Sequence, residues 1–210
     1  MNASYHSFLM DNYYERNNLI KRAVLTYVSL KQNSNKYYLI ELEEMKRGEF
    51  YIYQVIRKFG RIGISVRIEK TTYLDEEEAL RGFQSIYCSK TARGYTDVEE
   101  GYDFISLYWQ DIYHDRNIER FPLIPISSSQ IEKAYQILEK LEELLIQDVN
   151  DIYLIEKYSN QYYRAIPTAF GRTIHYKESL IDTFEKINQK RTFLNSLLHS
   201  IESKNNYLFF

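Results

Sequence analysis

The first half of the chain alternates between hydrophobic and polar residues in short segments, a pattern typical of β-strands. Four segments rich in β-branched and aromatic residues fit this description, at residues 23–30, 36–42, 50–59 and 64–70. Polar or glycine-containing stretches separate them, and such stretches commonly form turns. We therefore expect a small antiparallel sheet of four or more strands.

A different spacing begins at Asp75, where hydrophobic residues recur every three or four positions. Asp75 and Glu78 have the spacing of a capping box at a helix N-terminus. The residues that then repeat at helical spacing are Ala79, Leu80, Phe83, Ile86 and Tyr87. This pattern predicts an amphipathic helix over 76–89 that packs against the sheet.

The chain changes character after Phe121-Pro122, and helical spacing dominates the remaining residues. Overlapping capping signals at Ser127 and Ser129 precede a hydrophobic face that runs from Ile131 to Leu145. Further helices are predicted at 151–163 and 178–203, and the residue before Pro167 disfavours continuation of the first of them. These faces are expected to form the core of a helical bundle.

The sequence therefore predicts an α+β fold, a small antiparallel sheet with one packed helix followed by an all-α helical bundle. The expected organisation is an N-terminal extension at 1–21, a sheet domain at 22–112, a linker at 113–122 and a helical domain at 123–210.

Composition narrows the function classes. The net charge of the 210 residues is −2, so the overall charge does not indicate a nucleic-acid-binding protein. The lone Cys88 forms no intramolecular disulfide, and the four histidines are scattered without metal-ligand spacing. We expect no metal and no cofactor. No hydrophobic run approaches the ~18 residues that span a bilayer, so no membrane partner is expected.

The segment RKFGRIG (57–63) carries the strongest local signal. Five basic residues fall between Arg57 and Lys70, against the single acid Glu69. The G-x-x-G within it occurs as a backbone clamp in some RNA-binding modules, but there it lies between two helices. Here it joins two predicted strands, so a hairpin turn is the simpler interpretation.

The segments on either side of RKFGRIG support a second interpretation of it. NSNKYYLIELEE (33–44), YQVIRKFGRIG (53–63) and EEEALRGFQSIYCSKTARGY (76–95) resemble, in order, the first strand, signature loop and helix of a WGR domain. PISSSQIEKAYQILEKLEEL (125–144) and YSNQYYRAIPTAFG (158–171) are similar to the helical regulatory domain of DNA-dependent poly(ADP-ribose) polymerases.

The departures from that family matter for function. Phe59 stands where the Trp-Gly-Arg signature has Trp, and Thr168-Ala169 replaces the family's His-Asp. The segment between Tyr113 and Pro122 is too short for the first helices of the regulatory domain. The 210 residues end where the resemblance would place the ADP-ribosyltransferase domain. We therefore expect a shortened regulatory domain and no catalytic residues in this chain.

The resemblance implies that the sheet domain grips DNA at a break through backbone and terminal-nucleotide contacts. By position, Asn35 and Lys36 match the family's Asn-Lys at the DNA edge, Phe59 its stacking Trp and Arg61 its signature Arg. In the family that Arg also bridges to neighbouring domains. Further candidates, chosen on charge alone, are Arg57, Lys58, Arg67 and Lys90.

Three functions stay open at this stage. The first is a non-catalytic nuclear subunit that contacts DNA, with RNA as the alternative ligand and cytoplasm as the alternative location. The second is a structural subunit without nucleic-acid binding, because residues 36–98 carry eleven basic and ten acidic residues, a net charge of +1. The third is a fragment of a longer polymerase. Without a catalytic domain on the same chain, the bundle is expected to dock a protein partner, either a transferase in trans or another subunit of a complex.

The first two functions differ in what they predict at the signature loop. A structural subunit should have Phe59 buried and Arg61 paired to an acid. A solvent-facing Phe59 beside unpaired Arg61 and Lys36 would instead favour nucleic-acid contact.

Overall fold

The computed structural model describes residues 17–64, 66–98, 126–148 and 151–207. Most of the expected N-terminal extension and the whole of the expected linker at 113–122 lie outside these residues. None of the described helices is long and apolar enough to cross a membrane.

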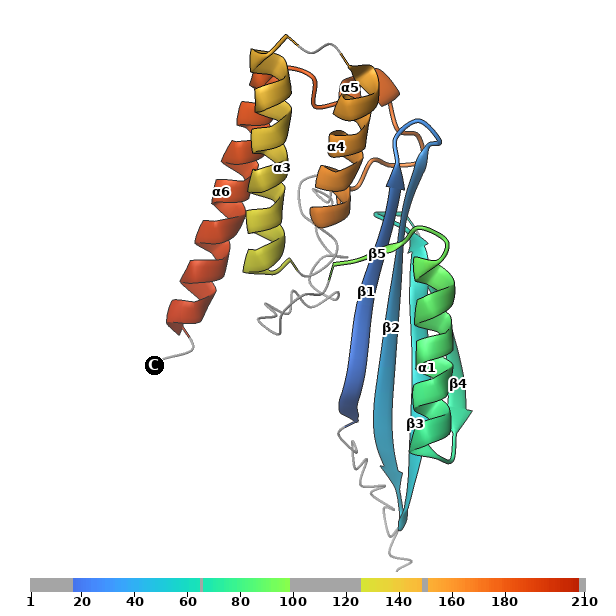
Figure 1. Cartoon of the computed structure of the whole chain (residues 1–210). Coiled ribbons are helices and arrows are strands. Elements are labelled where there is room, and N and C mark those ends of the chain that lie inside the picture. Colours follow the sequence, from blue (N-terminus) through green and yellow to red (C-terminus); the bar gives the residue numbers. More distant parts are fainter. Residues whose placement is uncertain (1–16, 65, 99–125, 149–150, 208–210) are drawn as a thin grey trace, which may run out of the picture.

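The first half of the chain forms one antiparallel sheet with strand order β4-β3-β2-β1-β5 (Figure 1). Its strands are β1 (Asn18–Ser29), β2 (Ser34–Arg47), β3 (Phe50–Arg61), β4 (Arg67–Tyr73) and β5 (Thr96–Asp97). The predicted antiparallel sheet is confirmed, but β4 begins three residues later than the predicted segment 64–70. Its three long strands extend beyond the predicted segments because polar residues continue the ladders past the hydrophobic core.

Glycine at one tight turn lets the β2–β3 ladder run to its end. Arg47 pairs with Phe50, which leaves only Gly48 and Glu49 in the loop. Gly48 has φ of 63°, the left-handed value that a two-residue hairpin loop requires at its first position.

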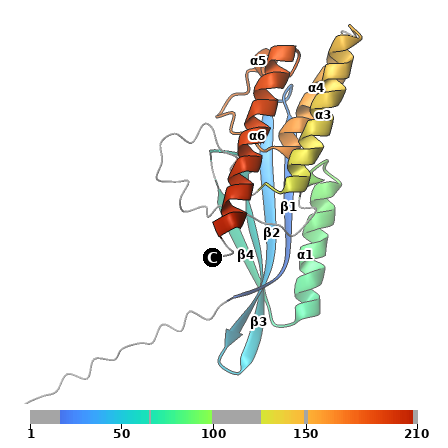
Figure 2. The same ribbon diagram turned by 90° about the vertical axis from the view of Figure 1, so that its left-hand side faces the viewer.

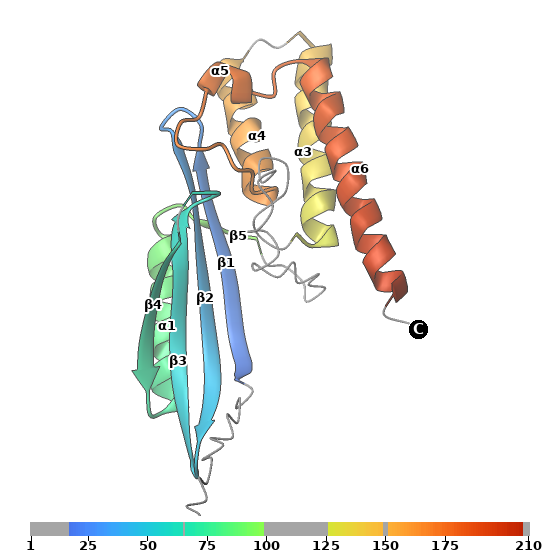
Figure 3. The ribbon, with the colours of Figure 1, turned by 180° about the vertical axis from the view of Figure 1, so that it is seen from behind.

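Helix α1 (Glu76–Thr91) covers one face of the sheet, as Figures 1 and 3 show from opposite sides. The Asp75 side chain accepts a hydrogen bond from the backbone N–H of Glu78, which caps the first turn as predicted. Ala79 and Phe83 are fully buried against alternate residues of the central strands, including Leu25 and Val55. Burial of a side chain the size of Phe83 contributes roughly 2–3 kcal/mol.

The second half of the chain is a helical domain at one end of the sheet (Figures 1 and 2). It consists of α3 (Ser128–Ile146), α4 (Ile152–Ala165), α5 (Tyr176–Ser179) and α6 (Phe184–Tyr207). Ser127 and Gln130 form the predicted capping box of α3. One core joins the three long helices and reaches Val28 and Leu30 of the sheet domain, so the two halves are packed together rather than merely linked.

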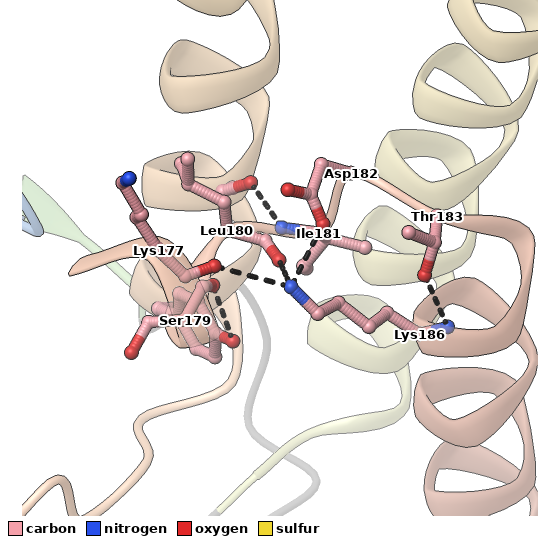
Figure 4. A network of polar contacts seen from close by, with 9 residues as sticks. Lys177, Ser179, Leu180, Ile181, Asp182, Thr183 and Lys186 are labelled. Carbon is pink, nitrogen blue, oxygen red and sulfur yellow. Dashed lines mark hydrogen bonds and ion pairs between the residues drawn. The ribbon is translucent and has the colours of Figure 1, made fainter. Parts of the chain in front are cut away.

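The prediction of one continuous helix over 178–203 was wrong. Leu180 takes an extended conformation and ends α5, and α6 begins only at Phe184. Figure 4 shows the contacts that stabilise the break. Lys186 Nζ donates to the carbonyl oxygens of Lys177 and Leu180 and to Asp182, at 3.2, 2.8 and 2.7 Å. The N–H of Ile181 is satisfied by Ser159 Oγ of α4 at 2.9 Å.

Candidate nucleic-acid interface

Three of the candidate side chains, at alternate positions of β3, lie on the side of the sheet that α1 covers. Val55 packs against α1 in the core of the sheet domain. Because side chains alternate along a strand, Arg57, Phe59 and Arg61 share that side with Val55. These three residues lie towards the end of the sheet where α1 ends, close to Lys90.

Phe59 lies within a cluster of aromatic rings. Its cross-strand partner Tyr38 stacks on it with ring centroids 4.9 Å apart and an interplanar angle of 14°. The Tyr95 ring lies at 81° to the Tyr38 ring, with centroids 6.4 Å apart. The centroids of Tyr27 and Tyr95 are 5.5 Å apart. Tyr38 is buried, but Phe59 is only half-buried. The cluster therefore leaves part of the Phe59 ring accessible to a ligand.

Basic side chains surround these rings. Lys90, in the last turn of α1, holds its Nζ 4.0 Å from the centroid of the Tyr38 ring. Burial is the main cause that lowers the pKa of Lys90, and the positive charges of Arg93, Arg57 and Lys36 lower it further, against an opposing effect from Glu69. Three further cations therefore lie near the Lys90 ammonium, which makes this part of the domain locally more positive than its small net charge suggests.

Two of the candidate arginines lie on the rim of this cluster. Arg67 pairs with Phe59 across the β3–β4 ladder and is exposed. Arg57 pairs with Glu69, and the two side chains form an ion pair at 3.2 Å. This partly exposed pair offsets some of the Arg57 charge, so Arg57 contributes less free positive charge than Lys36 or Arg67.

The structure does not bring Asn35 and Lys58 to this surface. Asn35 is fully buried, and its side-chain amide donates to the carbonyl oxygen of Thr168 at 2.8 Å. Lys58 lies on the opposite face of the sheet, with its Nζ 2.8 Å from the carboxylate of Glu41. Both assignments as nucleic-acid contacts remain predictions, and neither residue belongs to the surface described above.

Arg61 faces the helical domain and has three hydrogen bonds. Its Nε donates to the carbonyl oxygen of Gly171 at 2.8 Å, while Nη1 and Nη2 donate to the backbone and side-chain oxygens of Asn33. Asn33 is itself held in the left-handed region at φ 49°, and its side-chain oxygen also accepts from the N–H of Ile174 at 2.8 Å. The Arg61–Asn33 pair therefore joins the β1–β2 loop to the segment that follows Pro167.

Other contacts continue this junction along β1. Leu30 N–H donates to the Asn160 side chain at 2.9 Å, and the Arg164 guanidinium donates to the Val28 carbonyl at 3.1 Å. Thr26 Oγ1 donates to the Arg164 carbonyl at 3.1 Å. Groups of α4 thus bond to the end of β1 and to Leu30, beyond the short pairing of β1 with β5, and cover polar groups that would otherwise be open.

Neither of the two outcomes that would separate the hypotheses is observed. Phe59 is neither buried nor fully exposed, and Arg61 is bound to carbonyl and amide oxygens rather than to an acid. Sequence reasoning also missed Tyr38, Tyr95 and Arg93. Only the cross-strand register places Tyr38 beside Phe59, and period-two alternation counted from that pair was the available signal.

Comparisons with known proteins agree with this architecture. The sequence model of the WGR domain matches residues 21–102, and that of the poly(ADP-ribose) polymerase regulatory domain matches residues 110–208. Together these two matches account for most of the chain. Among the described residues, no group of His, Cys, Asp and Glu is arranged to hold a metal ion.

Full-length relatives align across both halves. Poly(ADP-ribose) polymerase 1 of Caenorhabditis elegans is 27% identical over 84% of this chain, and the Drosophila melanogaster polymerase is 25% identical over 83%. Poly(ADP-ribose) polymerase 2 of Arabidopsis thaliana is 22% identical over 87%. The aligned parts cover 23%, 21% and 36% of these relatives, so this chain spans well under half the length of each.

Proposed function

The chain carries a WGR domain followed by a regulatory domain of the poly(ADP-ribose) polymerase family, and on this premise we propose that it binds DNA ends or breaks. The proposed contact surface, called here the Phe59 surface, comprises Lys36, Arg57, Phe59, Arg67, Lys90 and Arg93. The observation that carries the proposal is the position of Lys90 over the Tyr38 ring that stacks on the partly buried Phe59, with Lys36, Arg57 and Arg93 close enough to lower the pKa of Lys90.

The chemistry of this surface suits the end of a nucleic-acid strand. Lys and Arg side chains neutralise phosphates without reading sequence. An aromatic ring that is open on one side stacks on a base or sugar exposed at a terminus, worth roughly 1–3 kcal/mol. Tyr38 supports the other side of the Phe59 ring and holds it in place for such a contact. A continuous duplex offers no terminal ring, so breaks are the favoured ligand.

A second function is supported by a separate observation. Arg61, the signature Arg, is occupied by Gly171 and Asn33 and joins the two domains. This favours a structural role for that residue, and a chain with only this role would be a scaffold subunit of a larger complex. In either case the 210 residues act in binding rather than catalysis, either as a nuclear subunit or as the corresponding part of a longer polymerase, with proteins as further partners.

The direct test is binding of labelled nicked, blunt-ended and single-stranded DNA, and of a matched RNA, at low and moderate salt. Wild-type protein should bind nicked or blunt-ended DNA at low salt, and Phe59→Ala and Lys90→Ala should weaken binding. Lys70→Ala is the matched control, because Lys70 is an exposed lysine of β4 that pairs with Ile56 and lies on the opposite face. Loss of binding in Lys70→Ala but not in Phe59→Ala or Lys90→Ala would move the contact away from the Phe59 surface, and no binding at low salt would favour the scaffold function.

A further inference from the structure

A pocket of about 340 Å³ lies between the two domains, and its described lining shares no residue with the Phe59 surface. Its described walls come from three elements that are distant in sequence, β5, α3 and α4. The lining includes Val98, Lys133, Ile137, Lys140, Gln161 and Arg164. The volume is at the lower end of the range for small-ligand sites, and domain interfaces are frequent places for them.

Three positively charged side chains belong to the described lining of this pocket. None of the ion pairs found among the described residues involves Lys133, Lys140 or Arg164. The one carboxylate in the described lining, Asp97, accepts a hydrogen bond from the Tyr87 hydroxyl, which also raises the pKa of Tyr87 after the larger effect of burial. The walls therefore carry three cations against one engaged acid.

Arg164 is the most constrained of these cations. It is half-buried, donates to the Val28 carbonyl at 3.1 Å and lies 5.8 Å from the centroid of the Tyr27 ring. Its Nε is buried without a hydrogen-bond partner. Burial lowers the pKa of Arg164, as expected for a charge whose surroundings do not fully compensate it. An anion in the adjacent pocket would supply that compensation.

The remaining lining suits an organic group attached to the anion. Val98 and Ile137 are buried apolar residues at the wall, and the Gln136 and Gln161 amides offer both donors and acceptors. We propose that this interdomain pocket binds a small phosphorylated molecule of nucleotide type, with Lys133, Lys140 and Arg164 holding the phosphate and the apolar wall and glutamine amides holding the rest.

The test uses the whole 210-residue chain with AMP and adenosine as probes in titration calorimetry. AMP should bind, and adenosine should bind at least tenfold more weakly because it lacks the charged group. Lys133→Glu should weaken AMP binding at least tenfold. Lys157→Glu, which makes the same charge change at an exposed residue of α4 outside the lining, should leave it unchanged.

Two further measurements keep the result interpretable. Melting temperatures of both variants should match the wild type, because neither lysine has a described ion pair; Gln161→Leu provides a second, charge-neutral variant of the lining. Phe59→Ala should bind AMP normally, which separates this site from the nucleic-acid surface. Absence of AMP binding, equal binding of AMP and adenosine, or equal loss in Lys157→Glu would overturn the proposal.

A phosphate at the end of a strand is a second source of the same chemistry. A 5′-phosphorylated trinucleotide that displaces AMP would show that strand ends also enter the pocket. If it fails to compete, the site is reserved for free nucleotides. AMP binding lost in Lys133→Glu supports the pocket in both cases.

Discussion

Arg61 donates a hydrogen bond of 2.8 Å to the carbonyl oxygen of Gly171, a residue 110 positions further along the chain. The two residues belong to the motifs that mark the two domains, Phe-Gly-Arg in the sheet domain and Ala-Phe-Gly in the helical domain. Their contact, reinforced by Asn33, makes the signature loop part of the domain junction. Two residues on the same side of β3 therefore have different surroundings, because Phe59 packs against Tyr38 and Arg61 faces the bundle.

Removal of the Arg61 guanidinium should weaken the domain junction more than it weakens ligand binding. Arg61→Ala leaves the Gly171 and Asn33 oxygens without their donor, so we expect destabilisation of about 1–3 kcal/mol. Urea denaturation followed by far-UV circular dichroism measures this change. Arg67→Ala, at an exposed arginine on the same side of the sheet, should alter stability by less than ~0.5 kcal/mol. Equal stability of the two variants would argue against the structural role of Arg61.

Aromaticity at position 59 should decide the strength of end binding. Phe59→Ala should weaken binding to blunt-ended DNA by roughly 1–3 kcal/mol, or about 5- to 150-fold in Kd. Phe59→Trp restores an aromatic face and should bind at least as tightly as the wild type. Fluorescence anisotropy provides the measurement. Phe59→Leu is the control for lost packing, and wild-type affinity in that variant would show that stacking contributes nothing.

Salt dependence should report the phosphate contacts one residue at a time. The slope of log K against log[salt] falls by ~0.9 for each lost contact with duplex phosphate. We expect Lys36→Ala to reduce the slope by about that amount and Lys70→Ala to leave it unchanged, because the two exposed lysines lie on opposite faces. DNA titrations at several salt concentrations give these slopes. Identical slopes for Lys36→Ala and the wild type would show that Lys36 makes no phosphate contact.

Two adjacent tyrosines in α4 allow a sharp stability test of the helical domain. The Tyr163 hydroxyl donates to the Ser179 carbonyl at 2.9 Å, whereas the Tyr162 hydroxyl is buried without a partner. Tyr163→Phe should therefore destabilise the protein by about 1 kcal/mol, and Tyr162→Phe should be neutral or stabilising. Thermal unfolding of the two variants gives the comparison. The reverse order would mean that Tyr162 has a polar partner in solution.

The ion pair between α3 and α6 should make the bundle sensitive to acid. A bidentate pair to Arg191, with distances of 2.9 and 2.6 Å, lowers the pKa of the Glu142 carboxyl. Because this pKa is depressed in the folded protein, the stabilisation is present above the unfolded value near 4.5 and is lost as the pH falls through the folded value.

Arg191→Met should remove this part of the acid dependence while keeping the apolar stem of the side chain. Unfolding measured from pH 6 down to pH 3 should show a shallower loss of stability in the variant than in the wild type. Both partners are about 30% exposed, so the effect should be small. An unchanged pH profile would mean that the pair contributes nothing in solution.

Local patterns in the sequence predicted the elements, but not their contacts. Alternation identified the sheet, and the Asp75 and Ser127 caps set the starts of α1 and α3. The break after α5 was missed because Leu180 and Ile181 continue the hydrophobic spacing of a helix. What ends the helix is tertiary: Lys186 and Ser159 satisfy the backbone groups that the break releases.

The candidate site was predictable only where side-chain direction follows from the strand. Counting residues from Phe59 places Arg57 and Arg61 on its side and Lys58 on the other, a distinction that selection by charge alone overlooked. The burial of Asn35 depends on Thr168, 133 residues away, and no local pattern contains that information. Recognition of Tyr38 as the partner of Phe59 required the strand register.

The central claim, that the Phe59 surface contacts nucleic acid, is tested most directly by backbone amide NMR of the chain titrated with a short blunt-ended duplex at low salt. We predict shifts concentrated at Lys36, Phe59, Lys90 and Arg93, with Ile68 and Lys70 on the opposite face unmoved. An unchanged spectrum, or shifts confined to the opposite face, would contradict the claim.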